Sequence, residues 1–322
     1  MGKFYSSRRK KKQKKETFGF VASLRNIKYL NRKSTRIYSN TDLSPAFSVI
    51  QGDILVTQPT PAMLNIIDIL YILIVCVSYP VGLLSVGIAL FLSPDLLQYG
   101  KTLSNHKTSS SYANIFNQIY KLQVKRSWFI HFYYLSCVFS CFNTIYEYTH
   151  YDSINISFLY LIHSTRRLLE TYKQNSTVHE DTYMNISHYL VGIWFYFNFN
   201  FLQLYKQTAN PNENISALQL LIFLTLNALQ CIHHLHIQSL KKYTIPYLYL
   251  FKRSYCAHYF IEILIYLSLM WFDHFSLETT LPFIWTFANL SVSAYNTKKW
   301  YIKKFNIKPT DQIHSLIPLY ST

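Results

Sequence analysis

Glycine is scarce in this sequence, with seven residues among 322 and no G-x-G pair. The Rossmann fingerprint needs closely spaced glycines, and the P-loop needs the full G-x-x-x-x-G-K-[ST] pattern, because in both the backbone approaches a phosphate closely. Neither pattern occurs, so both of these nucleotide-binding classes are excluded. Any nucleotide must be held by side chains such as Arg, Lys, Asn and Gln.

Clustered metal ligands are also few. All five cysteines lie within or at the edge of apolar segments, where thiols usually behave as small buried hydrophobes, and none forms a Cys-x-x-Cys pair. His233, His234 and His236 group together, but the other nine histidines scatter and the spaced HxxxH and HxxHH boxes of membrane di-iron enzymes are not seen. We expect neither a disulfide framework nor a bound metal.

Long stretches of the chain contain almost no charge. Residues 64–92 carry one charged side chain, Asp68, and are longer than the roughly 20 residues needed to cross the hydrocarbon core of a bilayer. Further apolar segments, several with Tyr, Trp and Phe at their ends as membrane interfaces favour, lie near 128–147, 154–172, 187–206, 215–237, 257–272 and 280–297. This pattern predicts an all-α integral membrane protein with about seven transmembrane helices.

The net charge of +16 is concentrated at the N-terminus, where the first 36 residues hold thirteen Lys and Arg against one acid, Glu16. Residues 1–60 are therefore predicted to be a basic, disordered extension ahead of a membrane domain over 61–322. Its expected partner is the anionic surface of the bilayer, not nucleic acid.

Loop charges predict the orientation. Loops 93–127, 238–256 and the stretch after 297 are basic, whereas 148–153, 207–214 and 273–279 contain acids and no Lys or Arg. The positive-inside rule then places the basic loops and the C-terminus in the cytosol. With seven spans and a cytosolic C-terminus, the basic extension would lie on the lumenal side. With six spans, both ends of the chain would lie in the cytosol, and both counts stay open.

Ionisable residues inside the predicted helices are functional candidates, because a charge in a membrane helix is costly. His163, Arg167 and Glu170 recur at three- and four-residue spacing and share one helical face, with Arg166 beside them. A second group contains Asn227 and Gln230 as well as the three clustered histidines, and a third pairs His258 with Glu262 one turn later. Arginines that snorkel to the headgroups and polar contacts that hold helices together are the alternatives.

Several short motifs follow one another over residues 95–322. In order they are Tyr99-Gly100-Lys101, Gln123-Val124-Lys125-Arg126-Ser127-Trp128-Phe129-Ile130-His131-Phe132-Tyr133, His163-x-x-Arg166-Arg167-x-x-Glu170, His188-x-x-x-Gly192, Tyr243-x-Ile245-Pro246, Cys256-Ala257-His258-Tyr259-x-x-Glu262 and Lys298-Lys299-Trp300-Tyr301-x-x-Lys304-Phe305. Taken together, these motifs resemble the steroid 5α-reductase family, and more closely its polyprenol reductase branch.

The resemblance implies a multi-pass reductase of the endoplasmic reticulum membrane that uses NADPH, acts on a polyprenoid lipid and opens to the cytosol, with its cofactor-binding half at about 215–322. The Glu and Tyr that bind the steroid ketone in the steroid branch stand here as Phe132 and Ser164, so a steroid substrate is not expected. The residues that would line the NADPH site are Arg167, Gln230, His234, Lys241, Tyr243, His258, Glu262 and Tyr301.

Hydride adds readily to a carbon–carbon double bond only if the developing negative charge has a sink, normally a conjugated carbonyl held by hydrogen-bond donors. An allylic alcohol offers no such sink. We therefore expect the α-isoprene unit to be reduced as its aldehyde, polyprenal to dolichal, on the way to dolichol, dolichol phosphate and protein N-glycosylation.

His131, Tyr133 and His163 are the candidate catalytic residues, as neutral donors in a dry cavity. His131 and Tyr133 lie near the start of a predicted span, so the alternative role is that of interface anchors. Two other functions also stay open. One is the reduction of trans-2-enoyl-CoA in fatty-acid elongation, where a thioester is the sink, and the other is a transporter or a non-enzymatic membrane protein.

Overall fold

The computed structural model describes residues 66–91, 122–177, 183–209, 214–241, 244–307 and 313–317. All of them belong to one compact unit, Ala62–Thr322. The predicted N-terminal extension, 1–60, lies outside the described residues, as does the Tyr99-Gly100-Lys101 motif.

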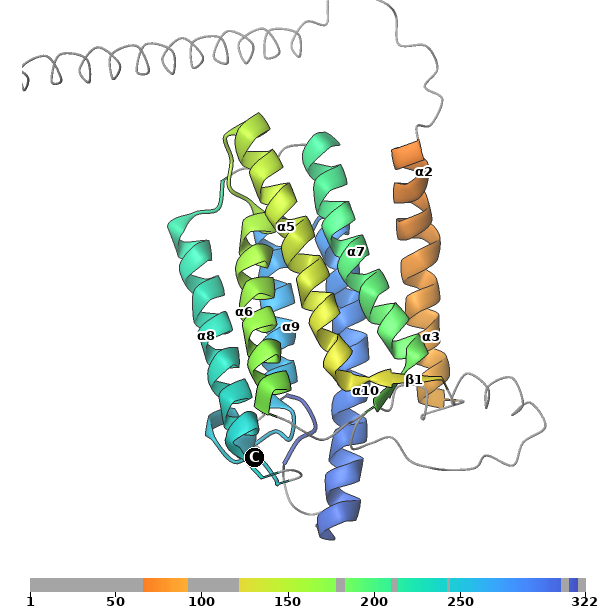
Figure 1. The fold of residues 1–322 in the computed structure, drawn as a ribbon, viewed down its shortest axis with the longest axis vertical. Coiled ribbons are helices and arrows are strands. Elements are labelled where there is room, and N and C mark those ends of the chain that lie inside the picture. Colours follow the sequence, from red (N-terminus) through yellow and green to blue (C-terminus); the bar gives the residue numbers. More distant parts are fainter. Residues whose placement is uncertain are drawn as a thin grey trace, which may run out of the picture. The chain divides into compact units, whose positions relative to one another are not determined.

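Seven long helices stand side by side in the described part of the chain (Figure 1). The first consists of α2 (Ile66–Leu73), a π-helical turn (Ile74–Ser78) and α3 (Tyr79–Phe91) in continuous succession. The others are α5 (Phe129–Tyr151), α6 (Ile156–Thr177), α7 (Ile186–Ala209), α8 (Ala217–Ser239), α9 (Ala257–Phe272) and α10 (Leu277–Phe305). Each coincides with a predicted apolar segment, which confirms the mostly helical architecture.

Two of these helices are long and apolar enough to cross a membrane by length and composition, Ile66–Gly87 and Ala217–Ser239, and α9 is a shorter apolar helix. The other helices alternate apolar stretches with polar side chains. In α5 and α7 many of these polar residues are buried in the bundle, which lowers the hydropathy of the helix without placing the polar groups on its outer face.

A small sheet, which the sequence did not predict, joins the starts of α5 and α7. Strand β1 (Gln123–Lys125) pairs antiparallel with β2 (Tyr183–Asn185), and Val124 faces Met184 across the ladder. A single 3-10 turn (Arg126–Trp128) then leads from β1 into α5. Because Met184 is fully buried, the sheet anchors these two helix ends to the apolar core.

Gly192 allows α5 and α7 to pack closely. A Cβ atom at this position would lie 2.5 Å from the ring of Phe132, nearer than van der Waals contact permits. Phe132 is itself buried, with 3% of its surface exposed. The glycine therefore makes room for an aromatic side chain directly against the helix backbone.

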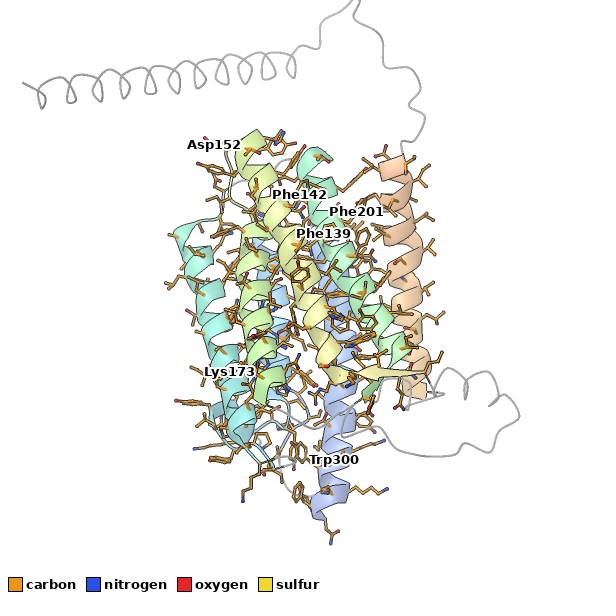
Figure 2. All side chains as sticks on the ribbon, viewed as in Figure 1. Phe139, Phe142, Asp152, Lys173, Phe201 and Trp300 are labelled. Carbon is orange, nitrogen blue, oxygen red and sulfur yellow. The ribbon has the colours of Figure 1, made fainter. Side chains whose placement is uncertain are left out.

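Buried polar contacts also hold the end of the bundle that carries Asp152 (Figure 2). Lys206 of α7 forms an ion pair with Asp273, which follows α9. Glu147 of α5 accepts a hydrogen bond of 2.5 Å from the Ser157 hydroxyl of α6. These contacts lie at the opposite end of the bundle from the candidate site described next.

Candidate cofactor and active site

A second buried network joins four helices in the half of the bundle where Lys173 lies (Figure 2). Its members are charged or strongly polar, although the surrounding core is aromatic and aliphatic. They are Tyr133 on α5, His163, Arg166, Arg167 and Glu170 on α6, Asn227, Gln230 and His234 on α8, and Glu262 on α9.

Glu170 is the centre of the network. Its carboxylate accepts hydrogen bonds from Arg166 Nη1 at 2.5 Å and from Arg167 Nη1 at 2.6 Å, and its Oε2 atom lies 2.7 Å from Nδ1 of His234. The side chain of Glu170 is 8% exposed, and those of the two arginines 15% and 19%. The arginines therefore point into the bundle instead of snorkelling along its outside.

Arg167 connects this centre to α5. Its Nη2 atom donates a 2.7 Å hydrogen bond to the Tyr133 hydroxyl, and its guanidinium carbon lies 4.9 Å from the centre of the Tyr133 ring. Tyr133 is buried, with 7% of its surface exposed. Because the phenolic oxygen accepts from Arg167, the phenolic proton is left to donate elsewhere.

Arg166 connects α6 to α8. Its Nε atom donates to Asn227 Oδ1 at 3.0 Å, and its Nη2 atom donates to the side-chain oxygen of Gln230. The same Asn227 oxygen lies 3.0 Å from Nδ1 of His163, which is fully buried. Nε2 of His163 lies 3.3 Å from Glu262 without a well-directed hydrogen bond.

Gln230 extends the network to α9, because its side-chain amide donates to the carboxylate of Glu262. His258, one turn before Glu262, approaches His234 with ring centres 5.7 Å apart. Together with Arg167, five of the residues predicted to bind the cofactor therefore lie in or beside the network, although they come from three helices.

Two further predicted cofactor residues lie beyond the network, and one cannot be placed. Tyr301 is buried at the end of α10, where its hydroxyl donates to the carbonyl of Thr244 at 3.3 Å. Lys241 is exposed just after α8, and Tyr243 lies outside the described residues.

His131 is placed apart from the other two predicted catalytic residues. It is exposed, its Nδ1 atom lies 3.1 Å from the Tyr189 hydroxyl, and its ring approaches Trp128 at 5.5 Å. The network brings together Tyr133 and His163, whereas His131 occupies the kind of aromatic setting that suits an interface anchor.

The three clustered histidines of α8 separate in space according to their contacts. His233 faces the carbonyl of Leu229, His234 belongs to the network, and the Nε2 atom of His236 accepts the backbone N–H of Tyr247. Across the described ranges, no group of three or more His, Cys, Asp or Glu side chains is arranged to hold a metal ion.

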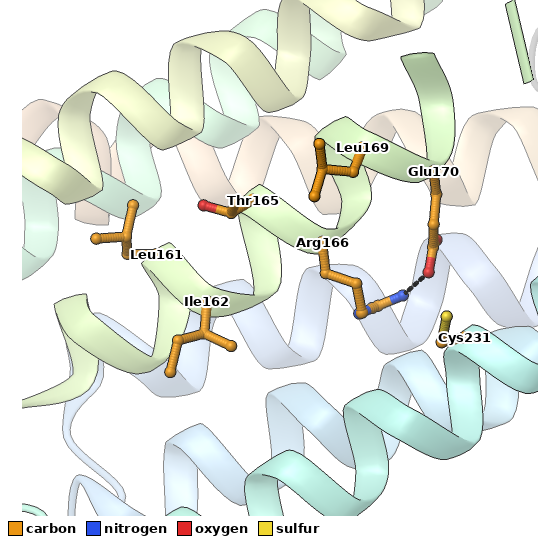
Figure 3. A pocket seen from close by; sticks show the side chains of 7 residues that line it. All are labelled: Leu161, Ile162, Thr165, Arg166, Leu169, Glu170 and Cys231. Carbon is orange, nitrogen blue, oxygen red and sulfur yellow. Dashed lines mark hydrogen bonds and ion pairs between the residues drawn. The ribbon is translucent and has the colours of Figure 1, made fainter. Parts of the chain in front are cut away.

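A groove of about 520 Å³ opens beside the network (Figure 3). The Arg166–Glu170 ion pair lies in one wall, and the remaining lining is mostly apolar. The lining residues are Leu161, Ile162, Thr165, Arg166, Leu169 and Glu170 of α6, and Cys231 of α8. An apolar chain with a polar end group matches the chemistry of this groove.

Comparison with known proteins agrees with this architecture. A family model described as 3-oxo-5-alpha-steroid 4-dehydrogenase matches residues 157–320, about half of the chain, from the start of α6 to beyond α10. The chain belongs to the steroid 5α-reductase family. It is also 37% identical over 236 residues to a protein of Saccharomyces cerevisiae (strain ATCC 204508 / S288c) named polyprenal reductase, covering 71% of this chain and 87% of the relative.

Members of the steroid 5α-reductase family are reductases that act on CH–CH groups, which means that they saturate a carbon–carbon double bond. This chain is such an enzyme. The family match begins at Ser157, so it includes the arginines and Glu170 but not Tyr133 on α5. The alignment with the yeast relative spans 236 residues and so covers more of the chain than the family model does.

Three members of the network were not assigned a role by sequence reasoning: Arg166, Glu170 and Asn227. The three- and four-residue spacing on α6 marked Arg166 and Glu170 as candidates. The pairing of Glu170 with both arginines is local to α6 and follows from this spacing. The contact of Glu170 with His234, and those of Arg166 with Asn227 and Gln230, could not be read from the sequence, because they depend on how α8 packs against α6.

Proposed function

We propose that this protein reduces the α-isoprene double bond of polyprenal with NADPH, giving dolichal for the synthesis of dolichol phosphate and for protein N-glycosylation. The observation that carries the proposal is the buried network centred on Glu170, in a chain that is 37% identical to the yeast protein named polyprenal reductase. A structural role alone does not require so many ionisable groups at one place.

The residues of the network suit a dinucleotide held without glycine loops. Arg167 Nε is buried and makes no hydrogen bond within the described part of the chain, so it has a donor left for a ligand. Arg167 and the exposed Lys241 would bind phosphates, while Gln230, His234, His258, Glu262 and Tyr301, with Tyr243, would bind the sugar and base groups. When bound, NADPH supplies the hydride.

The substrate end of the site requires donors for the carbonyl oxygen. Tyr133 and His163 lie on neighbouring helices in the network, and both can act as neutral donors. Donation to the aldehyde oxygen stabilises the negative charge that develops as the β carbon becomes saturated. The α carbon then takes up a proton, so that polyprenal, NADPH and one proton give dolichal and NADP⁺.

We further propose that the seven helices are seven membrane spans in the endoplasmic reticulum, with the site open to the cytosol. The basic side chains Lys241, Lys252 and Arg253 are exposed at the end of the bundle nearest the network. The positive-inside rule favours the cytosol for that end, where NADPH is available. The polyprenoid would approach from the bilayer, through the groove between α6 and α8.

Purified protein in detergent micelles tests this function directly. It should consume NADPH with polyprenal and not with polyprenol or trans-2-enoyl-CoA, since only the aldehyde combines a conjugated sink with an isoprenoid chain. Turnover of polyprenol alone would contradict the aldehyde mechanism. Turnover of trans-2-enoyl-CoA at a higher rate than polyprenal would instead favour fatty-acid elongation.

A further inference from the structure

The connection between α8 and α9 is tied to a segment from the C-terminal end of the chain. Ser254 and His314 form a parallel bridge, in which the backbone N–H of His314 donates to the carbonyl of Arg253 at 2.8 Å. The backbone N–H of Tyr255 in turn donates to the carbonyl of His314 at 3.0 Å. Residues 313–317 therefore pair with the connection immediately before α9 begins.

The hydroxyl of Ser254 extends this pairing to the helix itself. Ser254 is fully buried, and its Oγ atom donates a 2.7 Å hydrogen bond to the carbonyl of Leu316. The same oxygen accepts the backbone N–H of Cys256 at 3.2 Å, and Cys256 is the residue that caps α9. One side chain thus joins the C-terminal segment to the first turn of α9.

Apolar contacts reinforce the same junction. Leu316 is 7% exposed and belongs to a cluster with Tyr255, Cys256 and Tyr301. The Tyr255 and Tyr301 rings are stacked with centres 5.4 Å apart. The connection before α9 is therefore held on one side by residues 313–317 and on another by α10.

The position of α9 matters because it carries His258 in its first turn and Glu262 one turn later. Glu262 accepts the hydrogen bond from Gln230 that links α9 to the network. A rotation or shift of the first turn of α9 would displace both side chains relative to α8. The hydroxyl of Ser254 opposes that movement at the helix terminus, where the first N–H groups have no partners within the helix.

We propose that Ser254 is a positioning residue for the cofactor site, which acts by fixing the start of α9 against the C-terminal segment. The inference rests on the proposed function, since it assumes that NADPH contacts His258 and Glu262. It assigns residues 313–317 a role in cofactor affinity although none of them belongs to the network.

The test is a titration of purified protein with NADPH, followed by the change in NADPH fluorescence, in wild type and three variants. Ser254→Ala should raise the Kd for NADPH roughly fivefold to tenfold, as expected for the loss of one buried hydrogen bond. At saturating NADPH its kcat should match the wild type. Ser254→Thr, which keeps a hydroxyl, should restore most of the affinity.

Ser268→Ala is the matched control. Like Ser254, Ser268 is a buried serine, but it lies within α9. Its hydroxyl donates to the carbonyl of Ile265 at 2.7 Å and not to the C-terminal segment. This variant should change the Kd less than twofold. An equal loss of affinity in both alanine variants, or no loss in Ser254→Ala, would overturn the positioning role.

A measurement on the unmodified protein covers the case in which Ser254→Ala does not fold. Hydrogen exchange with and without NADPH should show slower exchange at residues 255–262 and at 313–317 together. Protection of the first turn of α9 without protection of 313–317 would contradict the inference alone. A wild-type protein that binds no NADPH would overturn both this inference and the proposed function.

Discussion

Replacing Glu170 by Gln should destabilise the protein strongly, because this buried carboxylate neutralises two partly buried arginines. Its two oxygens accept from Arg166 at 2.5 Å and from Arg167 at 2.6 Å, and only 8% of its side chain is exposed. The amide of glutamine removes the negative charge and turns an N–H₂ group toward one guanidinium. Removing one partner of a buried ion pair costs roughly 3–5 kcal/mol.

The expected change in melting temperature follows from this free energy. Each 1 kcal/mol corresponds to roughly 2–4 °C for a domain of this size class, so Glu170→Gln should lower the Tm by at least roughly 6 °C. The assay is thermal unfolding in detergent micelles, followed by tryptophan fluorescence. Arg166 and Arg167 remain present in this variant, so the change reports the missing counter-charge.

Glu278→Gln provides the matched control, because it makes the same substitution at the opposite end of the bundle. Glu278 accepts a 2.7 Å hydrogen bond from the neutral Tyr71 hydroxyl, and the loss should be roughly 1 kcal/mol, or about 2–4 °C. Equal shifts in Tm for the two variants would refute the view that Glu170 neutralises two partly buried cations.

Three further predictions concern the cofactor, the packing and the groove. Arg167→Ala should raise the KM for NADPH at least tenfold while changing the KM for polyprenal less, and an unchanged KM for NADPH in steady-state kinetics would show that Arg167 contacts no phosphate. Gly192→Ala should destabilise the protein by roughly 1–3 kcal/mol through overlap with Phe132, measured as a lower Tm, whereas Gly87→Ala, with nothing within 4 Å of the added methyl, should not. Because Cys231 lines the groove, polyprenal should slow its alkylation by N-ethylmaleimide, measured by mass spectrometry. The same rate with and without polyprenal would show that polyprenal does not enter through the groove.

The sequence predicted the helices well because each has its own local signal. Every long helix of the described chain coincides with an apolar segment, from 64–92 to 280–297, since burial or lipid exposure of apolar side chains decides where these helices form. The strands β1 and β2 could not be predicted in this way. Each has three residues, and their pairing depends on two helices meeting at one end of the bundle.

The candidate site was predictable in its residue types but less so in its geometry. Arg167, Gln230, His234 and Glu262 do meet, as intramembrane polar residues often do because isolated charges are costly in lipid. The same reasoning could not show that Tyr133 would join the network while His131, two positions earlier, would not. His131 faces away from the network because a shift of two positions rotates a side chain far around an α-helix.

The central claim is that hydride reaches the β carbon of a conjugated aldehyde held in the Glu170-centred network. It is tested most directly by incubating purified protein with polyprenal and NADPH that carries deuterium at the transferable position. Mass spectrometry and NMR should find dolichal with one deuterium at the β carbon. Deuterium at the aldehyde carbon, giving polyprenol with its double bond intact, would contradict the account.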